Sequence, residues 1–146
     1  MSSDAETDHL LTRAFFEALH PLLQRLSAKR TLSTGKLGVL RHLAEHGRAT
    51  TTELAVVVQV SPQAISLSAR ELERLQLVVR VPDAEDRRRS WIELTDAGRQ
   101  KLAEESGTVH DWITRSMAER LTAEERETLR AVIPVLRKLG SETSVD

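Results

Sequence analysis

Polar side chains of the kinds that read DNA bases recur on one side of the segment from Ser61 to Arg74. Ser61 is a typical helix cap and Pro62 suits the first helical position, so we expect a helix that begins there. At about 100° per residue, four residues fall within about 60° of Gln63: Ser66, Leu67, Arg70 and Arg74. Ile65, Ala69 and Leu72 fall on the opposite side.

This division suits a helix that enters the major groove. Gln63 can pair with adenine, Arg70 with guanine or a phosphate, and Ser66 with a base or a phosphate, while Leu67 could touch a thymine methyl group. An ordinary amphipathic surface helix shows the same division, so the helix alone leaves both interpretations open.

The densest cationic run of the chain is Arg87, Arg88 and Arg89. It lies in a charged loop, residues 82–90, between two stretches of alternating residues at 77–81 and 91–94, which predict a hairpin. An arginine at the tip of such a hairpin can enter a narrow minor groove. Asp86 would hold that arginine in place through a charge-assisted bond. The alternative is a solvated charged turn.

Helices with recognisable caps precede this hairpin. We expect one over 8–26, which Pro21 kinks or ends, and one over 33–46 that Gly47 closes. Thr50 and Glu53 form a capping box for a short helix to about residue 58. Only about two residues separate it from the helix that Ser61 caps, so the two must meet at a sharp angle as a helix-turn-helix.

Two helices follow the hairpin. Thr95 is expected to cap a long helix to about residue 120, which Gly98 and Gly107 weaken locally. Thr122 and Glu125 form a second capping box, and Pro134 is expected to kink the last helix, with a frayed tail after residue 140. The prediction is a mainly α (α+β) chain of four helices, a hairpin and two helices. The apolar faces of the terminal helices could pack on each other or on a second copy of the chain, which we favour.

Composition limits the possible functions. The chain has 146 residues, which fits one domain, and no cysteine, which excludes disulfides, thiolate metal sites and a cysteine nucleophile. A net charge of −1 argues mildly against nucleic acid, so that case depends on a local site. No apolar run is long enough for a membrane helix, and the acidic start does not resemble a signal peptide, so a cytoplasmic location is expected.

Residues 77–100, LVVRVPDAEDRRRSWIELTDAGRQ, resemble the wing of MarR-type regulators, the multiple-antibiotic-resistance family. The wing motif appears as Asp86-Arg87-Arg88, then Leu94-Thr95, then Gly98, and the segment TTELAVVVQVSPQAISLSARELERLQLV resembles the helix-turn-helix of the family. The resemblance implies a winged-helix homodimer that is a transcriptional regulator, usually a repressor and often relieved by a small molecule. It also implies that Arg88 enters the minor groove with Asp86 as its partner. Leu67 replaces a common arginine, and Gln76 replaces a common glycine before the first wing strand.

These arguments assign residues 1–32 to an N-terminal dimerisation helix, 33–98 to a winged helix-turn-helix and 99–146 to C-terminal dimerisation helices, with one MarR-type domain over about 8–142. The expected partners are a second copy and double-stranded DNA with an inverted repeat, with no cofactor, no metal and no membrane. The predicted DNA-binding residues are Ser61, Pro62, Gln63, Ser66, Leu67 and Arg70 in the helix, and Asp86, Arg87, Arg88 and Arg89 in the wing. Phe16, His20 and Trp112 could line an effector pocket, although core packing is the commoner role of such residues.

Two other functions stay open at this point. His42, Glu45 and His46 match the H-x-x-E-H pattern of a zinc peptidase, a remote alternative because the chemistry needs a third ligand and a cleft. The same histidines, with His110 or Glu45, could form a regulatory metal site. The main rival is a winged-helix module that binds protein and not DNA.

Overall fold

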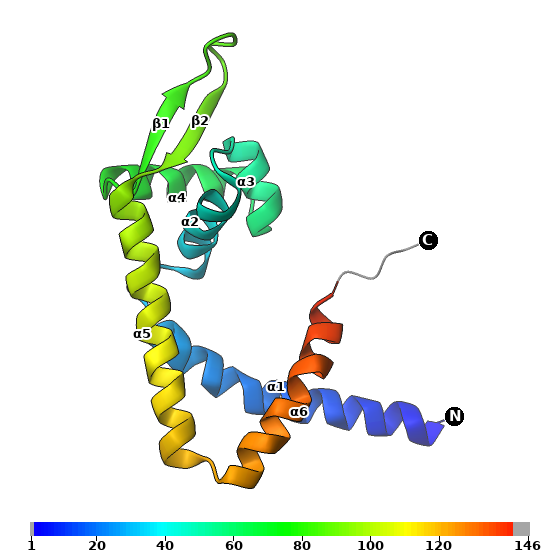
Figure 1. Ribbon diagram of the computed structural model, residues 1–146. Coiled ribbons are helices and arrows are strands. Elements are labelled where there is room, and N and C mark those ends of the chain that lie inside the picture. Colours follow the sequence, from blue (N-terminus) through cyan, green and yellow to red (C-terminus); the bar gives the residue numbers. More distant parts are fainter. Residues whose placement is uncertain (1, 142–146) are drawn as a thin grey trace. The chain divides into compact units, whose positions relative to one another are not determined.

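The computed structural model describes residues 2–141 and consists of six helices and one hairpin in the predicted order (Figure 1). The elements are α1 Ser2–Ala28, α2 Thr34–His46, α3 Thr51–Val58, α4 Pro62–Arg74, β1 Val78–Pro82, β2 Ser90–Leu94, α5 Asp96–Arg120 and α6 Ala123–Gly140. The chain divides within α5 into a unit up to Val109 and a unit from His110 onward. No helix in the described range is long and apolar enough to cross a membrane.

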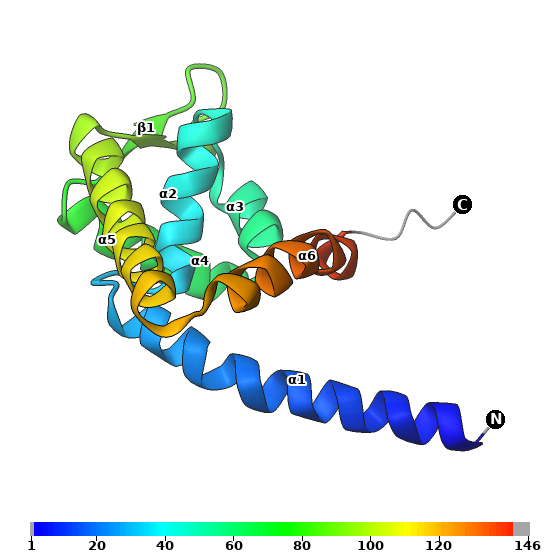
Figure 2. The same ribbon diagram turned by 60° about the horizontal axis from the view of Figure 1, so that its bottom comes forward.

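The hydrophobic core lies among α2, α3, α4 and the hairpin, which gather together in Figure 2. The largest fully buried side chains come from every one of these elements: Val39, Leu40, Leu43, Leu54, Ile65, Leu72, Val78 and Ile92. Each contributes about 1.5–3 kcal/mol of burial free energy. The core therefore fixes α4 against the hairpin, which is the arrangement that the sequence predicts for a winged helix.

An isolated bridge residue extends the two-stranded hairpin. In the antiparallel pair β1–β2, Arg80 lies opposite Ile92 and Pro82 opposite Ser90. Ala49 bridges to Ile92 and exchanges both backbone hydrogen bonds with it, at 3.1 and 2.8 Å. The segment between α2 and α3 is thereby tied to the hairpin, a link that the sequence analysis did not predict.

The predicted caps are confirmed at the starts of α3, α4, α5 and α6, where the hydroxyl groups of Thr50, Ser61, Thr95 and Thr122 each accept a backbone hydrogen bond. Thr50 and Glu53 form the complete capping box, with reciprocal bonds of 3.2 and 3.1 Å. At α6 the Thr122 hydroxyl accepts a hydrogen bond from the backbone N–H of Glu125, which is one half of the predicted capping box. The other half differs, because the Glu125 carboxylate accepts from the Thr122 hydroxyl and not from the backbone N–H of Thr122. Gly47 ends α2 with φ = 83°, as its type predicts.

The sequence analysis placed several boundaries wrongly. The first helix begins at Ser2, not at residue 8, and it does not end at Pro21 but continues to Ala28. As expected, α6 runs through Pro134, and the kinks expected at the two prolines stay predictions. Both prolines lie on exposed faces, where water can bind the carbonyl that loses its partner. The strands lie at Val78–Pro82 and Ser90–Leu94, shifted by one residue at three of their four ends. The expected frayed tail falls mainly on residues 142–146, outside the described residues.

Two helices expose apolar faces that the core does not use. On α1 these side chains include Leu10, Leu11, Phe15, Phe16, Leu22 and Leu23; on α6 they are Val132, Ile133, Val135, Leu136 and Leu139. No residue of α6 is buried. Exposed apolar surface of this extent on a helix is typical of an interface.

A buried carboxylate joins α5 to the linker before α2. Glu105 is 5% exposed and accepts hydrogen bonds from the backbone N–H of Thr31, at 3.0 and 3.1 Å, and from the Thr31 hydroxyl. Lys101 lies 3.4 Å away. Burial alone raises the pKa of Glu105, but the Thr31 hydrogen bonds and Lys101 together outweigh it, so the pKa lies below the ordinary value of 4.5.

Replacing Glu105 by glutamine is expected to lower the free energy of unfolding by about 1–2 kcal/mol at pH 7, because an amide cannot accept as many of these hydrogen bonds. Because the pKa of Glu105 is lower in the folded chain than the ordinary 4.5 of the unfolded chain, ionised Glu105 stabilises the fold at pH values above 4.5. This contribution is lost as the pH falls through the pKa of the folded state. Urea titrations of both chains from pH 7 to pH 3 should therefore converge at the acid end. Glu104→Gln, an exposed neighbour, is the control. A difference that does not change with pH would contradict the account.

Candidate nucleic-acid interface

The start of α4 is built as the sequence predicts. Ser61 has extended backbone angles, φ −64° and ψ 153°, and its hydroxyl accepts from the backbone N–H of Ala64 at 3.1 Å. Pro62 occupies the first helical turn, where a missing N–H costs nothing. The cap fixes where α4 begins and thus which side chains face outward.

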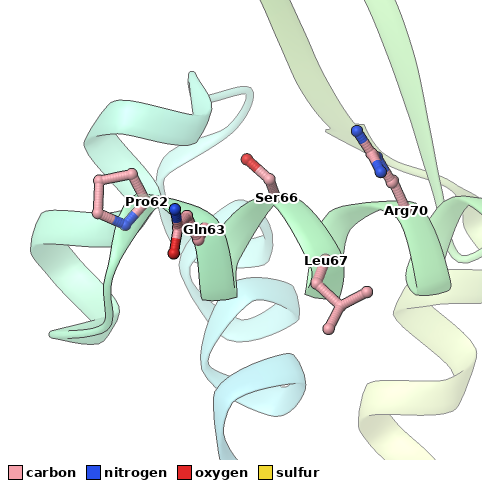
Figure 3. Close-up of a pocket in the computed structure, with 5 residues that line it drawn as sticks. All are labelled: Pro62, Gln63, Ser66, Leu67 and Arg70. Atoms are coloured by element: carbon pink, nitrogen blue, oxygen red, sulfur yellow. The ribbon is translucent and has the colours of Figure 1, made fainter.

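The outward face of α4 carries the predicted contact residues. Pro62, Gln63, Ser66, Leu67 and Arg70 line an open depression of about 350 Å³ (Figure 3). Ser66 and Arg70 point to the same side of the helix in that view, and Leu67 points the other way.

The inward face of α4 is the predicted core stripe. Ile65, Ala69 and Leu72 are each no more than 1% exposed. Gln63 and Arg70 therefore lie outside the core, while Leu67 is an apolar side chain that is 58% exposed. A polar row with one exposed leucine has the composition that base edges and thymine methyl groups require.

The turn from α4 into β1 holds a non-glycine residue in the left-handed region. Gln76 has φ = 61°, at the position where the MarR-type pattern often has glycine. Its carbonyl accepts from the Thr95 hydroxyl at 2.7 Å, so the turn also anchors the start of α5.

Gln76→Gly is expected to raise the free energy of unfolding by about 0.5–1 kcal/mol. A left-handed conformation costs a side-chain-bearing residue about 1–2 kcal/mol, and the added freedom of glycine in the unfolded chain offsets part of the gain. Chemical denaturation measures the change. Gln100→Gly, within α5, should lower stability by about 1 kcal/mol, and equal losses at both positions would contradict the prediction.

The wing loop is held by two aspartates. The Asp83 carboxylate accepts from the backbone N–H groups of Glu85 (2.9 Å) and Asp86 (3.3 Å) and from the indole Nε1–H of Trp91 (2.9 Å). The hydrogen bond from Glu85, followed by those from Trp91 and Asp86, holds the pKa of Asp83 below its usual value. The Asp83 carboxylate therefore joins the first half of the loop to the side chain of Trp91 on β2.

Asp86 restrains Arg88, but through the backbone. Its carboxylate accepts from the backbone N–H of Arg88 at 3.0 Å, and its carbonyl accepts from Arg89 at 3.1 Å. Within the described residues no ion pair within 4.0 Å joins Asp86 to an arginine side chain. Arg87, Arg88 and Arg89 are exposed, so their guanidinium groups are free to meet an anion.

The wing also borders α3. An open hollow of about 370 Å³ is lined by Thr50, Thr51, Thr52, Glu53, Asp86, Arg88, Arg89 and Ser90. The sequence analysis did not include the threonines among the contact residues. Their position at the first turn of a capped helix was the signal that could have suggested them, because such turns offer free N–H groups.

The histidines of the H-x-x-E-H pattern do not belong to a metal-ligand cluster in the described residues, and nothing in the structure tests the predicted effector residues. His42 and His46 stack with ring centroids 4.5 Å apart, but residues 2–141 contain no cluster of three or more potential metal ligands. Phe16 and His20 are exposed on α1 and Trp112 is half-buried on α5. The effector pocket stays a prediction.

Comparison with known proteins decides the family. The sequence profile of the MarR family matches residues 31–89, the segment from the linker before α2 to the end of the wing loop. The HTH-type transcriptional regulator YwhA of Bacillus subtilis is 30% identical over 129 residues, which cover 88% of this chain and 91% of that protein. The chain belongs to the MarR family. MarR-family proteins are DNA-binding transcriptional regulators and not enzymes, so the zinc-peptidase alternative is wrong.

Other MarR-type proteins agree with this assignment. The repressor MdtR of B. subtilis is 33% identical over 95 residues, 65% of this chain and 61% of that repressor, so the match spans less than two thirds of its length. A Pseudomonas aeruginosa structure described as a candidate transcriptional regulator has a TM-score of 0.82 at 27% identity and covers 94% of this chain and 98% of its own. A MepR variant from S. aureus, bound to an oligodeoxyribonucleotide, has a TM-score of 0.65 at 27% identity, with coverages of 88% and 97%.

Proposed function

We propose that this MarR-family chain is a homodimeric repressor that binds an inverted-repeat operator. Each subunit would lay α4 in the major groove, with Gln63, Ser66 and Arg70 toward base edges and phosphates, and would place Arg88 in the adjoining minor groove. The single observation that carries the proposal is that the exposed polar row of α4 and the exposed arginine loop belong to one packed unit.

A second copy of the chain would complete the regulator. The exposed apolar faces of α1 and α6 support this part of the proposal, because a two-fold dimer needs a self-complementary apolar surface. Residues 1–32 and 99–146 would supply the interface and residues 33–98 the DNA-binding part. Because the partner would be genomic DNA, we expect the chain in the cytoplasm.

A small-molecule effector would relieve repression. It would do so by binding one spacing of the two recognition helices more tightly than another, since a ligand shifts an equilibrium only by its preference between states. Phe16, His20 and Trp112 are the aromatic residues that we assign to this pocket.

Selection of bound duplexes from a random pool of double-stranded DNA tests the proposal. We expect an inverted repeat with half-sites about one helical turn, or a multiple of it, apart. Affinity for the recovered duplex across a salt series should fall with a log–log slope of about −0.9 for each phosphate neutralised. A slope near zero would favour a winged-helix module that binds protein.

A further inference from the structure

An indole on the outer face of β2 has no role in the core. The next residue, Ile92, is 1% exposed and is paired with Ala49. Because side chains alternate along a strand, Trp91 lies on the opposite face, where it is half-buried. A large aromatic ring at that place needs an explanation other than burial in the core.

Three groups converge on this ring. Its Nε1–H donates to Asp83 at 2.9 Å, and the guanidinium carbons of Arg48 and Arg89 lie 4.6 and 5.3 Å from the ring centroid. Both arginine distances lie within the roughly 6 Å at which a cation is attracted to an aromatic face. Trp91 thus contacts Asp83 and Arg89, the first and last residues of the loop between β1 and β2. It also contacts Arg48, which precedes α3.

The contact with Arg48 extends the link beyond the hairpin. Arg48 precedes Ala49, so the ring and the Ala49–Ile92 bridge both tie the wing to the segment before α3. A loop and side chains that are ordered before binding lose less conformational entropy when they meet DNA. The ring therefore favours a single position of Arg89 relative to the helix-turn-helix.

The two guanidinium groups keep their charge available. Neither Arg48 nor Arg89 has a carboxylate within 4.0 Å among the described residues. The Asp83 carboxylate, bonded to the same ring, is near enough for the charge of Arg89 to help lower its pKa, but it forms no ion pair with either arginine, so a phosphate can still bind the two guanidinium groups. Arg89 also lines the hollow that contains Thr51 and Thr52 at the start of α3.

We propose that Trp91 is a positioning residue for a phosphate-binding pair, Arg48 and Arg89, and that the phosphate belongs to the backbone of the DNA duplex. This inference rests on the proposed function. It adds to it a DNA contact, Arg48, outside both the recognition helix and the wing, and a residue that acts on DNA only through its neighbours.

Affinity for the duplex recovered by selection, measured across a salt series, tests the inference. Arg48→Ala and Arg89→Ala should each make the log–log slope shallower by about one. Trp91→Leu should weaken binding roughly tenfold, and Trp91→Phe, which keeps a ring but loses the Asp83 bond, should fall between Trp91→Leu and the wild type.

A double-mutant cycle between Trp91 and Arg89 distinguishes a positioning role of Trp91 from a purely structural one. In the Trp91→Leu chain, Arg89→Ala should cost clearly less affinity than it does in the wild type, because the arginine is no longer held. Arg87→Ala is the matched control, since it removes the same charge from the same loop without a contact to the ring, and its cost should be the same in both backgrounds.

The outcomes distinguish the two proposals. If selection recovers no duplex, the proposed function fails. If the wild type binds the duplex and Arg88→Ala weakens that binding, the proposed function stands. This inference alone is then overturned by either of two results: Arg48→Ala leaves the salt slope unchanged, or the affinity losses from Trp91→Leu and Arg89→Ala multiply in the double variant as for independent residues. Should Trp91→Leu fail to fold, the same coupling is measured with Trp91→Phe, and Arg48→Ala changes only an exposed side chain.

Discussion

Arg88→Ala is expected to weaken binding to the selected duplex by about 1–3 kcal/mol, roughly fivefold to 150-fold. Asp86 already holds the backbone of Arg88, and the guanidinium group is exposed with no ion pair to break in the described part of the chain. The substitution therefore removes a DNA contact without a compensating gain in the free protein. Fluorescence anisotropy at fixed salt measures the change.

Two further variants show whether the loss reflects the site or the net charge. Arg41→Ala removes one positive charge from an exposed position on α2, outside the predicted DNA contacts and the proposed dimer interface, and should leave the affinity nearly unchanged. Arg88→Lys keeps the charge but loses the planar fork, so it should bind with intermediate affinity. Wild-type affinity in Arg88→Ala would mean that the wing is only a solvated turn.

Gly98→Ala is expected to lower the free energy of unfolding by about 3 kcal/mol, which corresponds to a fall in Tm of roughly 10 °C. A Cβ at this position would lie 2.1 Å from the carbonyl oxygen of Leu77 and 2.6 Å from Cδ1 of Leu94. The leucine side chain can move, but the carbonyl belongs to the backbone and also accepts from Thr95 at 3.1 Å. Relief of the clash would separate the start of α5 from the root of the wing.

Gly107→Ala provides the matched control in the same helix. Nothing lies within 4 Å of a Cβ there, so alanine should raise stability by up to about 1 kcal/mol through its better helix propensity. Thermal and urea denaturation of the two variants should therefore change in opposite directions. Equal effects would show that the close approach at Gly98 does not limit the fold.

Local signals predicted the recognition helix well. The Ser61 cap, Pro62 at the first turn and the period of Ile65, Ala69 and Leu72 are properties of neighbouring residues, and the structure confirms each of them. The hairpin followed from alternation in the same way. The positions of Gly98 and Gln76 were noted in the sequence, but their roles depend on which backbone atoms lie nearby and on a positive φ.

Contacts between distant segments were not predictable from these patterns. The Ala49–Ile92 bridge and the Trp91–Arg48 contact each join residues 43 positions apart, and the Glu105–Thr31 hydrogen bonds join residues 74 positions apart. The alternative that the first helix ends at Pro21 was wrong, because an exposed helix can continue through a proline where water satisfies the lost hydrogen bond. The apolar faces of α1 and α6 could be recognised from the sequence, but what covers each of them could not.

The bridge between Ala49 and Ile92 has a consequence for the operator. Since the bridge ties the wing to the segment that leads into α3, we expect the helix-turn-helix and the wing to move as one rigid body. In the proposed complex, the distance between the bases that α4 would contact and the minor groove that Arg88 would enter is then set within each subunit. We expect an extra base pair within a half-site to lower the affinity far more than one near the two-fold centre of the operator. At that centre, a change in the relative orientation of the two subunits can accommodate the added length.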